Sequence, residues 1–210
     1  MSQIRTQTLT GNLQYENTVI LTYKITYPEI IFSYYEPGRS IFNKYNKDIA
    51  IKLEKYAKTE LYKNAVETYK FNKQNGYPIM VYELVSEYTI TYNHNYFISL
   101  YTDTYEFTGG AHGSTNRMSQ NWNLRTAKQI PLYFFYPNNP YYIIDILKNI
   151  NSQIKEHPEN YFDDYCSLVL ESFNLNNYYA TPDNIAIFFQ IYDIAPHATG
   201  IPVFLLPKSN

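Results

Sequence analysis

Hydrophobic and polar residues alternate at the start of the chain and then change to a helical period. Residues 4–9 and 13–27 are rich in Thr, Val, Ile and Tyr, and Gly11-Asn12 separates them, which predicts a strand, a turn and a strand ended by Pro28. From residue 40 to about residue 74 the period becomes helical, and the apolar positions are Ile41, Tyr45, Ile49, Leu53, Tyr56, Ala57, Leu61, Ala65, Val66 and Tyr69. This spacing predicts one long amphipathic helix, with Asn75-Gly76 as its C-terminal cap.

Alternation then returns in residues 79–92 and 96–107, which Asn93-His94-Asn95 joins as a hairpin. Tyr82 and Leu84 share the face that we expect to pack on the long helix. Shorter strands are predicted at residues 120–124 and 129–135.

The rest of the chain predicts a helix pair and closing strands. Asn139 is expected to cap a helix that runs to about residue 156, and a second helix covers residues 161–173. After the turn at Thr181-Pro-Asp-Asn184, residues 185–191 read as a central strand and residues 201–206 as the last one. The fold class is therefore α+β, with an antiparallel sheet packed against one long helix and a shorter helix pair.

The length of 210 residues predicts a single module, in which a first half, residues 1–107, is intertwined with a second half, residues 108–210. Lys and Arg number 17 against 19 Asp and Glu, without a basic stripe, so nucleic acid is not an expected partner. Codon bias, which also enriches Asn, Ile and Lys, explains the number of 25 Tyr but not their positions, so individual tyrosines can still stack on sugars or anchor a protein interface. We expect no membrane segment, since no apolar run reaches about 20 residues, and a buried, inert Cys166.

The only glycine cluster is Thr108-Gly109-Gly110-Ala111-His112-Gly113-Ser114, at the end of a predicted strand. Paired glycines permit positive φ and close approach of a partner, and His112 between small residues is sterically open. A tight turn whose His bonds a neighbouring carbonyl explains the cluster equally well.

The second cluster is Asp193-Ile-Ala-Pro196-His197-Ala-Thr-Gly200-Ile-Pro202, between the last two strands. Two prolines and a glycine stiffen the loop and hold His197 at its tip, where little entropy is lost on binding. An ordinary strand crossover is the alternative.

These residues suggest no catalytic or metal site. His112 and His197 lack the paired spacing of metal ligands. Ser114 follows no nucleophile elbow. No cofactor is expected. A carboxylate pair for glycoside cleavage stays open, because such pairs meet only in three dimensions.

Three segments of the chain together resemble a paired-domain family. They are the strand followed by Thr-Gly-Gly-Ala-His-Gly at residues 108–113, Asn123-Leu-Arg-Thr-Ala-Lys128, and Phe188-Phe-Gln-Ile-Tyr192-Asp-Ile-Ala-Pro196-His-Ala-Thr-Gly200. The family comprises the lysozyme-binding ectodomain of RsiV-type anti-sigma factors and the non-catalytic N-terminal part of PdaC-type peptidoglycan deacetylases. The resemblance implies an α+β module outside the membrane that recognises a lysozyme-like protein or cell-wall glycan. A free-standing cytoplasmic form stays possible.

The resemblance also implies binding residues, placed on two loops that contribute to one surface: Gly109, Gly110, His112, Gly113, Ala195, Pro196, His197 and Gly200. Asn123 stands where Asp is usual, Ala127 and Asn184 where Gly is usual, and His197 where Tyr is usual. The His197 change falls at the expected contact and so bears on the identity of the ligand.

Two further interpretations remain open. A polysaccharide hydrolase predicts two acids about 5–9 Å apart, one with a raised pKa, whereas a purely structural domain predicts loops that only finish the sheet. A glycan-binding form predicts a stacking platform of exposed Tyr and Trp122.

Overall fold

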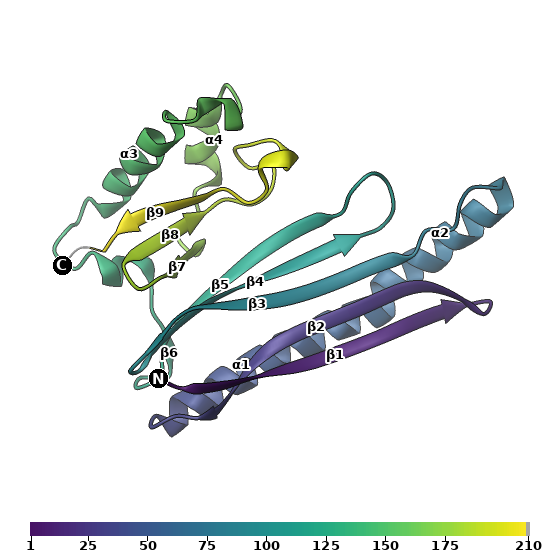
Figure 1. Cartoon of the computed structure of the whole chain (residues 1–210), viewed down its shortest axis with the longest axis horizontal. Helices are drawn as coiled ribbons and strands as arrows, with labels where there is room; N and C mark the ends of the chain where they lie inside the picture. Colours follow the sequence, from purple (N-terminus) through teal and green to yellow (C-terminus); the bar gives the residue numbers. More distant parts are fainter. Residues whose placement is uncertain (209–210) are drawn as a thin grey trace. The chain divides into compact units, whose positions relative to one another are not determined.

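The computed structural model describes residues 1–208 and confirms a mixed α+β fold (Figure 1). It has two sheets where the sequence predicted one. The larger sheet has the strand order β1-β2-β3-β4-β5-β6, and the smaller has the order β7-β8-β9. Contacts divide the chain into two compact units. One, the long-helix unit, comprises Ser2–Tyr88 and Thr102–Thr115. The other, the helix-pair unit, comprises Met1, Thr89–Tyr101 and the described residues from Asn116 onward. The expected division at residue 107 stays a prediction.

The first hairpin lies in the long-helix unit and is longer than expected. β1 (Gln3–Tyr15) and β2 (Thr18–Phe32) are joined by Glu16-Asn17, whose φ angles of 48° and 60° are typical of a tight hairpin turn. The turn expected at Gly11-Asn12 is wrong, because Gly11 pairs with Tyr23 inside the ladder. A Cβ at Gly11 would lie 2.4 Å from the Tyr23 ring, so only a glycine leaves space for this ring against β1.

Pro28 does not end β2, which is also a correction. Pro28 lies opposite Thr6 of β1, and the parallel pairing of β2 with β3 covers only Leu21–Ile25 against Tyr82–Ser86. Because the proline lies beyond this paired stretch, its missing N–H costs the β2–β3 ladder no hydrogen bond.

The long helix is present but begins earlier than expected and is interrupted. α1 (Glu36–Tyr56) passes through a π-helical turn, η1 (Ala57–Leu61), into α2 (Tyr62–Asn75), and Figure 1 shows them as one rod along β1 and β2. Gly76 ends the rod with φ 70°, which confirms the predicted cap.

The π turn keeps the buried side of the rod against the sheet. Ile41 and Tyr45, expected in the core, are exposed. The buried positions are Gly38, Phe42, Asn46, Ala50, Ala57, Leu61, Ala65 and Tyr69. Most of these follow one another at steps of four, which exceed the roughly 3.6 residues of an α-helical turn, so the stripe would drift around a regular helix. The wider π turn absorbs an extra residue and reduces this drift.

The middle strands largely follow the predicted pattern. β3 (Tyr82–His94) and β4 (Phe97–Phe107) flank the expected turn, and Tyr82 and Leu84 pack with the long helix in one core cluster. β5 (Ser114–Asn123) is longer than expected, and β6 is only Lys128–Gln129. The strand predicted at residues 129–135 is wrong: Pro131 interrupts it, and the 3-10 turn η2 (Leu132–Phe135) buries Leu132 and Phe135 in the core.

The helix-pair unit contains both shorter helices and the smaller sheet. α3 (Tyr142–Ile154) and α4 (Tyr165–Ser172) flank the 3-10 turn η3 (Pro158–Asn160). The sheet consists of β7 (Tyr178–Ala180), β8 (Asn184–Phe188) and β9 (Val203–Pro207), all antiparallel, with β8 in the centre as predicted. Within residues 1–208, no helix has the length and apolar character needed to span a membrane.

Two local expectations in this unit need correction. Asn139 lies before the cap position, where its Oδ1 accepts a hydrogen bond from the Tyr141 N–H at 2.9 Å, so α3 begins later than expected. Cys166 is exposed rather than buried, because α4 turns Val169 to the core.

Two buried tyrosines in the same core should respond oppositely to removal of their hydroxyl groups. The Tyr178 hydroxyl donates to the Ile130 carbonyl, whereas the buried Tyr136 hydroxyl has no partner among residues 1–208, and its burial raises the pKa of Tyr136 to about 12. Tyr136→Phe is expected to raise the free energy of unfolding by about 1 kcal/mol, and Tyr178→Phe to lower it by about 1–2 kcal/mol. Urea denaturation of both variants tests this, and changes of the same sign would contradict it.

Ala127 adopts a left-handed conformation, with φ 56°, in the turn between β5 and β6. Asn123 supports this turn, since its Oδ1 accepts hydrogen bonds from the N–H groups of Arg125 and Thr126 at 3.0 and 3.2 Å. Ala127→Gly is expected to raise the free energy of unfolding by about 0.5–1 kcal/mol, because glycine relieves the strain but loses more entropy on folding. Thermal denaturation measures this, and a loss of stability would contradict the interpretation.

Candidate functional site

The glycine cluster forms the connection between β4 and β5 in the long-helix unit. Gly109 and Gly110 have φ angles of 100° and 91°, a region that other residues rarely adopt. Gly113 has a different reason to be glycine: an added Cβ would lie 2.5 Å from both the Glu106 carbonyl oxygen and the Tyr105 ring. These three glycines are therefore explained by the turn and by close packing.

His112 is exposed on this turn. Its Nδ1 lies 3.3 Å from the carbonyl oxygen of Gly113, as the tight-turn interpretation predicts. The ring stays accessible from outside, so a binding role for His112 remains a prediction.

The second candidate loop, residues 190–202, lies between β8 and β9 in the helix-pair unit, and we call it the His197 loop (Figure 1). Its first residue, Gln190, pairs with both backbone groups of Arg117 on β5: Oε1 accepts from the N–H at 2.9 Å, and Nε2 donates to the carbonyl at 2.8 Å. At the other end, the Phe189 N–H donates to the Pro202 carbonyl at 3.0 Å. The loop is thus fixed at both ends.

The middle of the His197 loop is also held. The Asp193 carboxylate accepts from the Gln190 N–H at 2.8 Å, and the Ile194 carbonyl accepts from the Phe162 N–H at 3.2 Å. The 3-10 turn η4 (His197–Thr199) follows, and the Thr199 hydroxyl donates to the Asn160 carbonyl at 2.9 Å. A loop held in this way loses little conformational entropy when it binds a partner.

Tyr192 is the feature of this loop that sequence reasoning missed. Its φ angle is 69°, a strained value for a bulky residue, and its side chain is 55% exposed. The Tyr192 and His197 rings lie 5.5 Å apart. Backbone strain cannot be read from residue types, so only the structure reveals this pair of an exposed Tyr192 and a half-buried His197.

The other predicted residues of the loop divide by burial. Ala195 is buried and belongs to the core cluster, so it attaches the loop to the core and does not face a partner. Pro196 is exposed, and Gly200 has φ 73°, which glycine adopts without strain. The glycine turn and the His197 loop belong to different units, and a common surface stays a prediction.

The expected glycan platform needs correction at Trp122. The Trp122 side chain is buried, and its Nε1 donates to Gln120 Oε1 at 2.8 Å. It therefore cannot stack on a sugar from solution.

The acids do not favour the hydrolase interpretation. Hydrogen bonds from Lys73, Arg5 and Lys58 lower the pKa values of Glu16, Glu29 and Glu54 respectively, the opposite of what a general acid requires. Residues 1–208 contain no group of three His, Cys, Asp or Glu side chains placed to hold a metal ion.

The chain is an α+β protein that carries two family segments in sequence. Residues 14–115 match the family described as Deacetylase PdaC, and residues 134–209 match the family described as Protein of unknown function (DUF3298). Both models match, in the order that the paired-domain resemblance predicts, which confirms that resemblance.

Two solved structures share the fold. A DUF3298 family member from Bacteroides fragilis NCTC 9343 is 17% identical, with a TM-score of 0.66 over 98% of this chain and 91% of that one. A DUF3298 family protein from Pseudomonas aeruginosa PAO1 is 14% identical, with a TM-score of 0.60 over the same shares. The search of curated proteins finds no match. At these identities the likeness shows the fold alone.

Proposed function

We propose that this chain is a non-catalytic binding module of the bacterial cell envelope, which docks a lysozyme-like protein through the His197 loop. The family pair supports the envelope association, since PdaC and DUF3298 segments indicate a cell-envelope-associated family. The observation that carries the choice of surface is Tyr192, an exposed aromatic ring held on a strained backbone beside His197.

A protein partner fits this loop better than a glycan does. Tyrosine is enriched at the centre of protein interfaces, because its ring offers a large apolar surface with a polar tip and loses few rotamers. The loop is fixed by hydrogen bonds at Gln190, Ile194 and Thr199, so it can enter a concave surface without being ordered first. Trp122, the strongest stacking residue of the chain, is buried.

Isothermal titration calorimetry of the chain with purified lysozyme tests the proposal. Micromolar or tighter binding is the expected result. Tyr192→Ala and His197→Ala should each weaken the affinity by about 30-fold, or roughly 2 kcal/mol. Tyr141→Ala is the matched control, because Tyr141 is a 69% exposed tyrosine of the same unit outside the loop. Absence of heat with lysozyme, or equal losses in the control, would refute it.

Tyr192→Gly separates function from stability. Glycine accepts a φ of 69° without strain, so this variant is expected to unfold at the same urea concentration as the parent or higher. It should nevertheless bind lysozyme as weakly as Tyr192→Ala. A clear loss of stability would show that the ring holds the loop together rather than serving a partner.

A further inference from the structure

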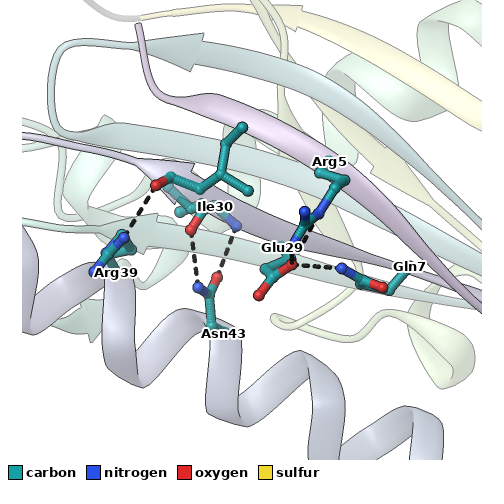
Figure 2. A network of polar contacts seen from close by, with 7 residues as sticks. Arg5, Gln7, Glu29, Ile30, Arg39 and Asn43 are labelled. Atoms are coloured by element: carbon teal, nitrogen blue, oxygen red, sulfur yellow. Dashed lines mark hydrogen bonds and ion pairs between the residues drawn. The ribbon is translucent and has the colours of Figure 1, made fainter.

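A polar hollow on the long-helix unit has no role in the function proposed above. Two adjoining cavities of about 510 and 500 Å³ share Glu29 and Asn43 as lining residues. Their walls come from β1, β2 and the first half of α1, and Figure 2 shows this junction. The hollow lies in one unit, so its geometry does not depend on the other.

The walls of the hollow are fixed by side chains that bind backbone. The Asn43 amide pairs with both groups of Ile30, donating to the carbonyl at 2.9 Å and accepting from the N–H at 2.8 Å, as a neighbouring strand would (Figure 2). Arg39 Nη1 donates to the Ile31 carbonyl at 3.0 Å. The helix therefore stays attached to the outer part of β2, and the hollow exists before any ligand arrives.

Hydrogen bonds to one carboxylate oxygen, Oε2, hold Glu29 in position and leave the other oxygen, Oε1, as a hydrogen-bond acceptor. Its Oε2 accepts from Arg5 Nε at 3.2 Å, from Arg5 Nη2 at 2.6 Å and from Gln7. These bonds, Arg5 first and Gln7 second, hold the pKa of Glu29 below its usual value. Oε1 accepts no hydrogen bond from any of residues 1–208, and Figure 2 shows it without a dashed line.

The larger cavity adds further hydrogen-bonding groups and an aromatic ring. Asp48 binds Lys44 through Oδ2 at 2.6 Å, which leaves Oδ1 as an acceptor. Lys47 lines the same cavity, and its ammonium group makes no ion pair or hydrogen bond within the described chain. The half-buried Tyr27 completes the lining.

This mixture of groups selects among ligand classes. Arg5 and Lys44 already neutralise Glu29 and Asp48, so a metal ion finds no free carboxylate charge and is repelled by Lys47. A simple anion has no hydrogen to donate to the remaining carboxylate oxygens of Glu29 and Asp48. A saccharide suits the carboxylates and the ammonium group alike, because each of its hydroxyl groups can donate to a carboxylate and accept from an ammonium. The Tyr27 ring can also contact the C–H side of a sugar. The volume of about 510 Å³ falls within the range of small-molecule sites.

We propose that this hollow between α1 and the β1–β2 hairpin is a saccharide-binding site for a cell-wall glycan, in which Glu29 and Asp48 accept hydrogen bonds from sugar hydroxyl groups and Lys47 donates to a hydroxyl or carboxylate oxygen. The site lies in the PdaC segment and partly before it, whereas the His197 loop lies in the DUF3298 segment. The two proposals stand separately: the chain would hold glycan with one segment and a protein with the other.

Titration of the ¹⁵N-labelled chain with a soluble tetrasaccharide of alternating N-acetylglucosamine and N-acetylmuramic acid tests the site. Amide shifts are expected at residues 27, 29, 30 and 43–48, since Pro28 has no amide proton. Lys47→Ala should weaken the affinity about tenfold, the loss of one charge-assisted hydrogen bond, whereas Lys52→Ala, an exposed lysine on the same helix, should leave it unchanged. Asp48→Asn should also weaken it, since the amide loses the negative charge.

Shifts confined to residues 190–202, no shifts at millimolar tetrasaccharide, or equal affinities of the Lys47 and Lys52 variants would overturn the proposal. Lysozyme binding separates this result from the other proposal. Lys47→Ala is expected to bind lysozyme as the parent does, so failure of one site leaves the other measurable.

Discussion

Replacement of Asn121 by leucine is expected to lower the free energy of unfolding by about 3–5 kcal/mol, because three buried groups lose a partner. Asn121 is buried on β5 of the helix-pair unit. Its Oδ1 accepts from the Ser99 hydroxyl at 2.7 Å and from the Ala180 N–H at 3.3 Å, and its Nδ2 donates to the Tyr178 carbonyl at 2.9 Å.

This network connects the two sheets inside one unit. Ser99 and Asn121 come from β4 and β5, and their partners belong to β7. Leucine has the branched shape of asparagine but is larger and can neither donate nor accept. The Tyr178 carbonyl and the Ser99 hydroxyl therefore lose the Asn121 amide where water cannot reach them, whereas the Ala180 N–H keeps its 2.8 Å bond to Ser99 Oγ.

Urea denaturation of Asn121→Leu measures the effect. The control is Asn116→Leu, because Asn116 is exposed on the same strand and its replacement should change stability by less than about 0.5 kcal/mol. Equal losses in the two variants would show that the network contributes nothing specific.

Gly113→Ala is expected to lower the free energy of unfolding by about 3 kcal/mol, since its Cβ would lie 2.5 Å from the Glu106 carbonyl oxygen and the Tyr105 ring. The Glu106 carbonyl belongs to the backbone of β4, which cannot move aside as the end of a flexible side chain can. The hairpin of β4 and β5 would have to separate at this point.

Gly110→Ala is the informative comparison. Gly110 has a positive φ of 91°, but an added Cβ there meets no atom within 4 Å. Strain alone should cost about 1–2 kcal/mol. Thermal denaturation of both variants separates packing from conformation, and a smaller loss for Gly113→Ala than for Gly110→Ala would reverse the interpretation of this turn.

These glycine results also bear on binding. If Gly113→Ala is destabilised as expected, packing is sufficient reason for glycine at that position, and loss of binding in this variant would not identify a contact. His112→Ala is then the better test of the turn, because His112 is exposed and lies outside the close approach.

The sequence determined the α+β class, the long helix with its cap at Gly76, the hairpin of β3 and β4, and the central position of β8. Each depends on a local signal: a periodicity, a glycine at a helix end, a turn between alternating strands, or an apolar run. Such signals act over a few residues and so are legible without knowledge of the contacts.

Tertiary structure decided the features that depend on distant residues. Gly11 looked like a turn residue, but the Tyr23 ring of the neighbouring strand requires a glycine inside β1. Residues 129–135 looked like a strand, but aromatic side chains buried after Pro131 favour a 3-10 turn.

The candidate sites divide in the same way. Prolines and glycines pointed to the His197 loop, yet the strain at Tyr192 and its approach to His197 appear only in the folded loop, which hydrogen bonds to Arg117, Phe162 and Asn160 hold in place. The hollow at Glu29 and Asn43 had no sequence signal, because its groups come from two strands and a helix that only folding brings together.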